Sequence, residues 1–387
     1  MPRRGGGRAA ARARPDQRRE ATLSQDESGR TDEGHMARAI ELAQGVRTTT
    51  SPNPWVGCVI VDRDGRVVGE GATAPPGGPH AEHAALALAQ RRARGATVYV
   101  TLEPCAHHGR TPPCTDALIR AGVARVVAGV GDPDERVAGA GFRALEQAGV
   151  SVAVGVLARD VSDQLRPYLV HRSTGRPYVV LKLAATLDGR TAAPDGSSRW
   201  ITGVEARRDV HRLRAESDAV LVGAGTVRCD DPALDVREDA APAPSRQPLR
   251  VVLGHVPGRA RVQPALELGG DLGVVLDDLG RRGVLQLLVE GGAHVAHAFH
   301  RDGLVDRYVW YLAPAFLGGD DGIPVFAGPG ATTMAEAWRG RLVSVCRFGD
   351  DLRVDVEPFP VRPSRESAAP GGSVPRWPAN SQPARGR

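Results

Sequence analysis

The sequence predicts an α/β protein made of two consecutive domains. Its 387 residues are enough for two ordinary cores. Aromatic residues make up only 4% of the chain, whereas Val, Ala and Leu are plentiful, which is typical of α/β proteins. Short apolar strands alternate with helical segments over most of the length, and this alternation indicates a sheet with helices on both faces.

The first half is predicted to open with a helix and a β-hairpin and then to alternate. We expect helices over residues 36–44, 80–94, 114–121 and 139–148, and strands over residues 56–62, 67–72, 96–102, 123–130 and 150–156. Asp64-Gly65 supplies the hairpin turn, Gly95 ends the second helix, and residues 104–113 form a loop.

The second half begins after Arg176-Pro177 and repeats strand–turn–helix units. Strands are expected over residues 178–184, 219–223, 249–253, 285–290 and 308–312, with one helix over residues 205–215 and another running through Phe299. Glycines follow two of these strands, at Gly223-Ala224-Gly225 and Gly291-Gly292. They let a backbone approach a phosphate at a helix N-terminus, although tight packing also explains such glycines.

The residues most informative about function are a histidine, a glutamate and two cysteines. His80, Cys105 and Cys114 offer one imidazole and two thiolates, a set that holds Zn²⁺ and leaves its fourth position open for water. Zinc lowers the pKa of such a water, and Glu82 is placed to move protons without binding the metal. The pattern matches the H-x-E…P-C-x-x-C signature of nucleobase deaminases, except that eight residues separate the cysteines.

The expected elements bring this motif to one end of a sheet. His80 and Glu82 lie in the first turn of one helix, Cys114 opens the next helix, and Cys105 follows a strand, where ligands gather in open α/β sheets. A purely structural zinc site is the alternative, but three ligands beside a glutamate favour a catalytic one. Three nearby histidines are expected to be polar lining or surface residues: His83, His107 and His108.

The formal charge of +5 belongs to the ends of the chain. Residues 1–34 hold 8 Arg and 6 acidic residues, and residues 361–387 hold 5 Arg and 1 acidic residue, which leaves the remainder near −1. A nucleic-acid groove is therefore not predicted. Both ends are rich in Gly, Pro, Ser and Arg, so we expect disordered tails at 1–34 and 361–387 around domains at 35–170 and 177–358.

Cysteine usage and hydropathy predict a cytoplasmic protein without a membrane partner. Five cysteines in a chain of this length make no disulfide framework, and two of them belong to the metal motif. The sequence offers no apolar run of transmembrane length, and its N-terminus lacks the apolar stretch of a secretory signal.

Lys182 is the single lysine among 50 basic residues. A retained ammonium indicates a site where a planar guanidinium does not serve, and accidental survival of one lysine is the alternative.

Ordered motifs across residues 35–358 resemble those of the RibD family of bifunctional riboflavin-biosynthesis enzymes. The motifs are NPWVGC at 53–58, PHAE at 79–82, TLEPCAHHGRTPPC at 101–114, LKLAATLDGRTA at 181–192, RWITG at 199–203, GAGTVRCDDPAL at 223–234 and VEGG at 289–292. The eight-residue separation of the cysteines distinguishes that family from cytidine and transfer-RNA deaminases.

The resemblance implies two consecutive reactions on one pyrimidine nucleotide. A cytidine-deaminase-like αβα sandwich would deaminate 2,5-diamino-6-(5-phosphoribosylamino)pyrimidin-4(3H)-one. A dihydrofolate-reductase-like α/β domain would then use NADPH to reduce the ribosyl group to ribityl. His80, Cys105 and Cys114 match the family's zinc ligands and Glu82 its proton shuttle.

The resemblance also implies contacts with both ligands. Positions that match NADP contacts are Ala184, Trp200, Thr226, Asp230, Gly292, Ala293, His294, Val295, Ala296, His297 and Ala298. Positions that match substrate contacts are Asn53 in the deaminase half, and Ser198, Arg214, Leu234, Arg237 and Glu290 in the reductase half. Two arginines suit a phosphate ester, because a guanidinium binds its oxygens bidentately.

Lys182 is expected to be a catalytic residue, with its ammonium near the ribose or its phosphate, where it would polarise the opened sugar. Asp230 could support proton delivery, but Asp230-Asp231-Pro232 is equally a turn and a helix cap.

Three features depart from the family pattern. A later helix histidine is lost and His83 stands one position earlier, which turns its side chain about 100° around the helix, so His83 does not replace it. The strand after Arg250 ends in Leu253-Gly254-His255 instead of an Asp-Ser pair, which makes His255 a candidate for a 2′-phosphate contact. The segment between His255 and Glu290 is about one strand–helix unit shorter than the family pattern.

These departures leave alternatives to a bifunctional enzyme. One is a deaminase with an inactive or weakened reductase domain, and another is a homologue that modifies a related pyrimidine in secondary metabolism. A nucleic-acid deaminase with an RNA-binding appendage is disfavoured by the near-neutral middle of the chain and the long cysteine loop. A homo-oligomer through the second domain is implied by the resemblance.

Overall fold

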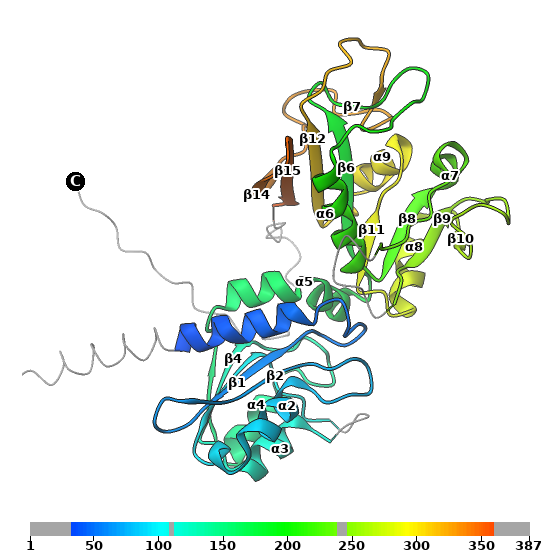
Figure 1. Ribbon diagram of the computed structural model, residues 1–387. Coiled ribbons are helices and arrows are strands. Elements are labelled where there is room, and N and C mark those ends of the chain that lie inside the picture. Colours follow the sequence, from blue (N-terminus) through cyan, green and yellow to red (C-terminus); the bar gives the residue numbers. More distant parts are fainter. Residues whose placement is uncertain (1–31, 108–111, 238–245, 360–387) are drawn as a thin grey trace, which may run out of the picture.

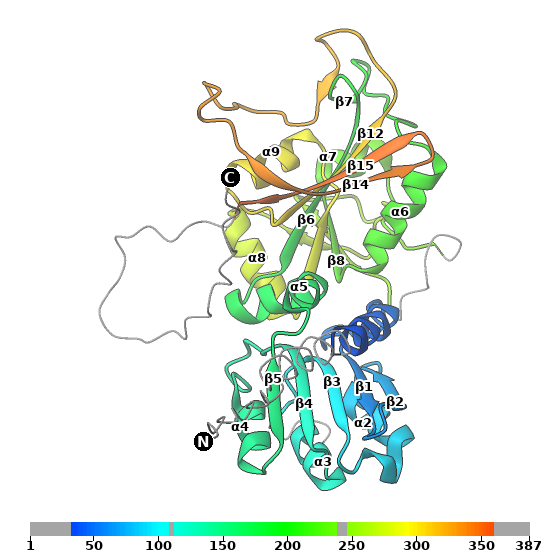
Figure 2. The same ribbon diagram turned by 90° about the vertical axis from the view of Figure 1, so that its left-hand side faces the viewer.

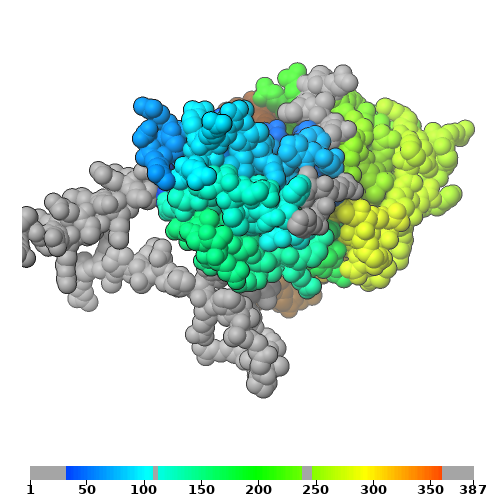
Figure 3. Space-filling model, turned by 90° about the horizontal axis from the view of Figure 1, so that it is seen from below, coloured from blue at the N-terminus to red at the C-terminus, as the bar shows by residue number. Residues whose placement is uncertain are grey.

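The computed structural model describes residues 32–107, 112–237 and 246–359, which form two lobes stacked in Figure 1. We call residues 32–175 the first lobe and residues 176–359 the second lobe. Seen from the end of the first lobe, part of the second lobe projects to one side (Figure 3). The expected tails at 1–31 and 360–387 lie outside the described residues, as does His108.

The folded chain starts earlier than residue 35, the expected domain boundary. A helix already covers residues 32–45. Asp32 is buried and accepts hydrogen bonds from the Tyr99 hydroxyl at 2.8 Å and from Arg125 at 2.7 Å. These contacts, which composition does not reveal, fix the first turn of the helix on the sheet.

The first lobe contains a five-stranded sheet in the order β2-β1-β3-β4-β5. Its strands are β1 (Gly57–Val61), β2 (Val67–Ala72), β3 (Thr97–Leu102), β4 (Arg125–Val130) and β5 (Ser151–Val154). β1 is antiparallel to β2 and β3, whereas β3, β4 and β5 are parallel. The sandwich has helices on both faces, as predicted.

The helices of the first lobe form two layers (Figures 1 and 2). One face carries α2 (Ala81–Ala89), α3 (Cys114–Ala121) and α4 (Ala140–Gln147), and the other carries the helix over residues 32–45 and α5 (Ala158–Thr174). The expected helix over 80–94 ends at Ala89 and continues as a 3₁₀ turn, Gln90–Ala93.

A glycine in β2 lets α2 lie close to the sheet. A Cβ atom on Gly71 would lie only 2.3 Å from the carbonyl oxygen of Ala81, so a side chain there would push the helix away. Because Ala81 begins α2, this close approach fixes the turn that carries His80 and Glu82.

The second lobe contains an eight-stranded sheet in the order β10-β9-β8-β11-β6-β12-β15-β14. Its strands are β6 (Tyr178–Thr186), β8 (Ala219–Gly223), β9 (Leu249–Leu253), β10 (Leu266–Leu268), β11 (Gln286–Val289), β12 (Arg307–Ala313), β14 (Gly340–Phe348) and β15 (Asp351–Pro358). Neighbouring strands from β10 to β12 are parallel, while β15 and β14 are antiparallel additions. A separate pair joins β7 (Arg190–Ala192) to β13 (Ile323–Pro324).

Helices cover both faces of this sheet with separate apolar clusters. On one face α8 (Leu272–Arg281) and α9 (Ala293–Arg301) contribute Leu276 and Phe299. On the other, α6 (Val204–Ala215) and α7 (Ala224–Asp230) contribute Leu213 and Val227. Burying an aliphatic side chain of this size stabilises the fold by about 1.5–3 kcal/mol.

The element that joins the lobes was not predicted. α5 runs across the expected boundary near residue 170, and Pro167 within it masks the helical pattern. Leu165 belongs to the first core, whereas His171 Nε2 lies 3.0 Å from the Gly280 carbonyl oxygen of the second lobe. The lobes therefore share a continuous helix instead of a free linker.

The described ranges contain no helix that is both long and apolar enough to cross a membrane.

Candidate active sites

The first lobe brings His80, Cys105 and Cys114 together at one end of its sheet. His80 precedes α2, Cys105 follows β3 and Cys114 is the first residue of α3. The Nδ1 atom of His80 lies 3.6 Å from the Sγ atom of Cys105 and 3.3 Å from that of Cys114. Tetrahedral Zn²⁺ with metal–ligand distances of about 2.0–2.3 Å needs ligand atoms about 3.6 Å apart. The three side chains therefore fit a zinc ion.

Glu82 lies beside this cluster without belonging to it. It is in the first turn of α2 and is buried, at 4% exposure. Burial, with the nearby Cys105 sulfur, raises the pKa of Glu82 to about 7. Such a carboxyl group is suited to both accepting and donating protons.

Other residues named from the sequence surround the cluster. His83 is outside it, and its Nε2 atom lies 3.2 Å from the Pro112 carbonyl oxygen, so it supports the loop between the cysteines. His107 is also outside it. Asn53 is half-buried in the loop before β1, where its N–H donates to the Thr50 carbonyl at 2.9 Å.

The second lobe contains a cleft of about 1010 Å³ at the carboxyl ends of its parallel strands. A volume at the upper end of the usual range for ligand sites suits a nucleotide substrate together with a dinucleotide. Residues named from the sequence that line it are Lys182, Ala184, Ser198, Trp200, Arg214, Thr226, Asp230, Leu234, Arg237, Glu290, Gly292, Ala293, His294 and Val295. Ala296, His297 and Ala298 do not line it, because they lie deeper along α9, where His297 is 2.8 Å from the Pro329 carbonyl oxygen.

Three charged residues in the lining of the cleft interact with one another. Arg214 donates to both carboxylate oxygens of Glu290, at 2.6 and 3.0 Å. Burial alone would raise the pKa of Glu290, but Arg214 and Lys182 outweigh it and hold that pKa below its usual value. Burial lowers the pKa of Lys182, against the attraction of Glu290. The only lysine of the chain thus lies beside a buried carboxylate.

The cleft has further basic residues that the sequence analysis did not select. Arg199, Arg207, Arg208, His211 and Arg261 also line it. The spacing of Arg207, His211 and Arg214 on one face of α6 was the signal that could have found part of this set. A surface this rich in arginine fits the phosphates of NADPH and of a nucleotide.

The glycines at the strand ends serve two purposes. A Cβ atom on Gly291 would lie 2.5 Å from the side chain of Val295, so this glycine is required by packing. Gly292 donates its N–H to Thr226 Oγ1 at 3.2 Å and faces the cleft beside the N-terminus of α9.

Two of the departures from the family pattern fall in this lobe, at His255 and in the shorter segment before Glu290. His255 is not part of the cleft, and its Nδ1 atom lies 2.5 Å from Glu267. The shorter segment before Glu290 still supplies β10 and α8.

Comparison with known proteins agrees with this arrangement. A family model for the cytidine and deoxycytidylate deaminase zinc-binding region matches residues 29–130, and one for the RibD C-terminal domain matches residues 177–354. The riboflavin biosynthesis protein RibD of Escherichia coli is 44% identical over 360 residues, which cover 83% of this chain and 98% of that protein. The chain belongs to the RibD family.

Other RibD proteins extend the match to structure. RibD of Mycobacterium tuberculosis is 47% identical over 328 residues, covering 82% of this chain and 94% of that protein. The structure of Acinetobacter baumannii RibD superposes with a TM-score of 0.81 at 39% identity, and covers 86% of this chain and 100% of its own. The first lobe is thus cytidine-deaminase-like and the second has the RibD reductase fold.

Family membership settles the general activity. The chain is an enzyme of riboflavin biosynthesis with deaminase and reductase activities, and its cofactors are Zn²⁺ and NADPH. The alternative of a silent second half is not favoured, because the reductase region matches its family model throughout. Its substrate is a small pyrimidine compound.

Proposed function

We propose that the first lobe deaminates 2,5-diamino-6-(5-phosphoribosylamino)pyrimidin-4(3H)-one and that the second lobe reduces the ribosyl group of the product to ribityl. The observation that carries this proposal is the presence, in one chain, of the zinc-fitting cluster beside buried Glu82 and of the cationic cleft around Lys182. A Thermotoga maritima structure named as a diaminohydroxyphosphoribosylaminopyrimidine deaminase and 5-amino-6-(5-phosphoribosylamino)uracil reductase supports it, with 35% identity and a TM-score of 0.78.

For deamination, His80, Cys105 and Cys114 would hold the metal, which when bound would activate a water molecule for attack on the ring carbon. Glu82 would take one proton from the attacking water and pass it to the ring nitrogen, and then take the second from the new hydroxyl group and pass it to the amino group, so that ammonia departs and a carbonyl group remains. Asn53 binds the pyrimidine at the mouth of the site. Glu82 is suited to this task because it adjoins the cluster while remaining outside the ligand set.

For reduction, the cofactor supplies the hydride and the protein supplies alignment. Lys182 faces the opened sugar and polarises it, while Glu290 keeps the ammonium in place. Arg214 already donates to Glu290 and to the Asp235 carbonyl, so its main task is to orient Glu290. Arg237 is better placed to bind the substrate phosphate. Its side chain is 62% exposed, and its ion pair with Asp235 is long, at 3.9 Å.

The NADPH contacts are assigned to a second set of residues that line the cleft. Ala184, Trp200, Thr226 and Asp230 line it, together with the α9 N-terminus from Gly292 to Val295. A helix N-terminus attracts phosphate through its free N–H groups. For Ala296, His297 and Ala298 we propose an indirect role, in which they hold this helix in position.

We also propose that the enzyme is cytoplasmic and forms a homo-oligomer through the second lobe. Thiolate ligands and NADPH both suit a reducing compartment. β14 is the last strand of its sheet, and Leu342 and Val345 on it are 59% and 53% exposed. An apolar edge strand of this kind is a surface on which a second copy can pair. Neither nucleic acid nor a membrane is proposed as a partner.

A stepwise assay tests the two reactions. Zinc-loaded protein receives the diaminopyrimidine nucleotide, and ammonia is measured before NADPH is added. Ammonia release followed by NADPH oxidation supports both assignments. Removal of zinc by a chelator should stop ammonia release, while NADPH oxidation with the deaminated nucleotide continues. Ammonia release with no NADPH oxidation would contradict the reductase assignment.

A further inference from the structure

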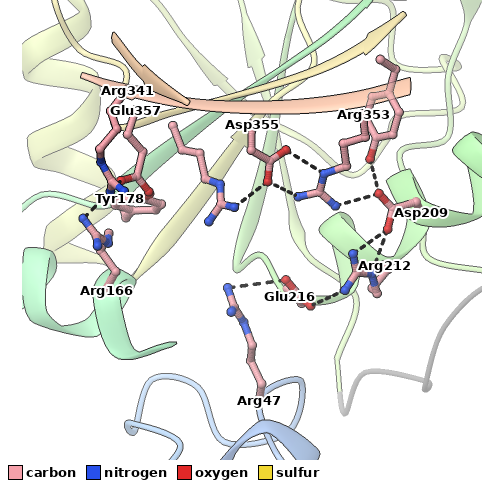
Figure 4. Close-up of polar contacts among 12 residues, drawn as sticks. Arg47, Arg166, Tyr178, Asp209, Arg212, Glu216, Arg341, Arg353, Asp355 and Glu357 are labelled. Atoms are coloured by element: carbon pink, nitrogen blue, oxygen red, sulfur yellow. Dashed lines mark hydrogen bonds and ion pairs between the residues drawn. The ribbon is translucent and has the colours of Figure 1, made fainter. Parts of the chain in front are cut away.

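The loop that carries Asn53 belongs to the contact between the lobes. Arg47, which enters this loop, extends from the first lobe toward the second (Figure 4). Its Nη2 atom donates to Gln286 Oε1 at 2.9 Å and lies 3.5 Å from a carboxylate oxygen of Glu216. The side chains of Arg47 and Glu216 are only 15% and 12% exposed, so solvent screens this ion pair weakly.

The same loop is held at a second point. The Ser51 hydroxyl donates to the carboxylate of Asp218, which also accepts from Arg246 at 2.6 Å. Asp218 is fixed within the second lobe, because its other oxygen accepts from the N–H groups of Leu285 and Gln286 at 2.8 and 3.1 Å. Ser51 is therefore tied to the amino ends of β8 and β11.

Glu216, one of the partners in the second lobe, adjoins a larger network of charges. Glu216 follows α6 and lies 3.9 Å from Arg212, which donates to Asp209. Asp209 in turn accepts from Arg353 of β15 at 2.7 Å (Figure 4). Through Glu216, Arg47 thus contacts a charge network that joins α6 to β15.

The loop reaches the zinc cluster through β1. The guanidinium of Arg47 also lies over the Trp55 ring, 5.0 Å from its centroid. Arg47 therefore contacts a residue on the far side of Asn53 in the sequence. Two residues later Gly57 begins β1 and donates to Thr101 Oγ1 at 3.2 Å. Because β1 is antiparallel to β3, the beginning of β1 lies beside the end of β3, from which Cys105 follows.

We propose that the second lobe positions the pyrimidine-binding loop of the deaminase, with Arg47 and Ser51 as the positioning residues. This proposal rests on the proposed role of Asn53. Arg47 and Ser51 bracket the turn before Asn53 and attach it to Glu216, Gln286 and Asp218. The reductase lobe of the same chain thereby holds the loop of the deaminase substrate site in place, through the end of its sheet opposite the cleft.

Single substitutions in the full-length, zinc-loaded enzyme test this proposal. Arg47→Ala and Ser51→Ala should each raise the deaminase KM, and the double substitution should raise it about tenfold, or ~1.4 kcal/mol. The deaminase kcat, the zinc content and the reductase kcat/KM should stay within about twofold of the original values, because the metal cluster and the cleft are untouched.

Arg38→Ala is the matched control. Arg38 is on the helix over residues 32–45, which precedes Arg47, and it pairs with Glu70 at 2.9 Å, but both residues belong to the first lobe. This variant should leave the deaminase KM unchanged.

Two results would overturn the proposal. One is an unchanged KM in the double variant, and the other is a parallel fall in both activities or in zinc content, which would indicate general destabilisation. The variant Asn53→Ala distinguishes a failure of this proposal from a failure of the substrate-binding role proposed for Asn53. If Asn53→Ala leaves KM unchanged, the assignment of Asn53 fails, while the double variant still decides whether contact between the lobes holds the site.

Discussion

Replacing Glu290 with Gln removes a carboxylate from the lining of the reductase cleft. Glu290 and Arg214 are 8% and 15% exposed and form two hydrogen bonds, so the substitution leaves a buried guanidinium without its counter-charge. Breaking a buried pair from one side costs about 3–5 kcal/mol, and we expect the lower end because glutamine keeps one acceptor. For a lobe of this size, about 3 kcal/mol lowers the melting temperature by about 6–12 °C.

Differential scanning calorimetry of the zinc-loaded enzyme measures this change, and NADPH oxidation measures its functional consequence. The reductase activity should fall because Lys182 loses the carboxylate that keeps its ammonium charged, whereas ammonia release in the first lobe should persist. Asp277→Asn is the matched control, since Arg176 and Asp277 also lie 2.6 Å apart but are 41% and 43% exposed. A pair this exposed contributes little to stability, because water screens it. Equal losses of stability in the two variants would refute the reasoning from burial.

Three further predictions concern single residues. Glu82→Gln should lower deaminase kcat by about 10²–10⁴-fold with zinc content and reductase activity retained, and ammonia release at the original rate would contradict its role as proton carrier. Lys182→Arg should lower reductase turnover because a guanidinium cannot replace the compact ammonium, so unchanged turnover would remove its special role. Asp209 has a lowered pKa because the Tyr311 hydroxyl and Arg353 outweigh the effect of burial. Its stabilising contribution is therefore complete above the unfolded pKa of about 3.9 and is lost as the pH falls through the folded pKa, so Asp209→Asn should flatten the acid limb of the stability–pH curve.

The zinc-fitting cluster was predictable because its members occupy informative places in the sequence. His80 and Glu82 share one helical turn, Cys114 opens a helix, and Cys105 follows an apolar strand. Each of these placements follows from a short sequence window. The deaminase half was therefore predicted element by element except for α5, with small shifts at helix and strand ends.

β15 was missed, and its pattern is the reverse of the usual one. Its charged and apolar residues alternate as in a strand, but Asp351, Arg353, Asp355 and Glu357 are the buried set, no more than 8% exposed, whereas the apolar residues between them are more exposed. These charges are tolerated because Arg353 bridges Asp209 and Asp355, and Arg307 and Arg341 pair with the acidic residues beside it (Figure 4).

The sequence by itself determined the two α/β domains and the zinc-fitting set with its neighbouring glutamate, and it drew attention to a single lysine whose role stays a prediction. Only the tertiary structure decided which charges meet. Arg47 is 169 positions from Glu216, and Lys182, Arg214 and Glu290 come from three separate elements. The physical reason is that helix and strand patterns depend on near neighbours, whereas the partner of a buried charge depends on how distant elements pack.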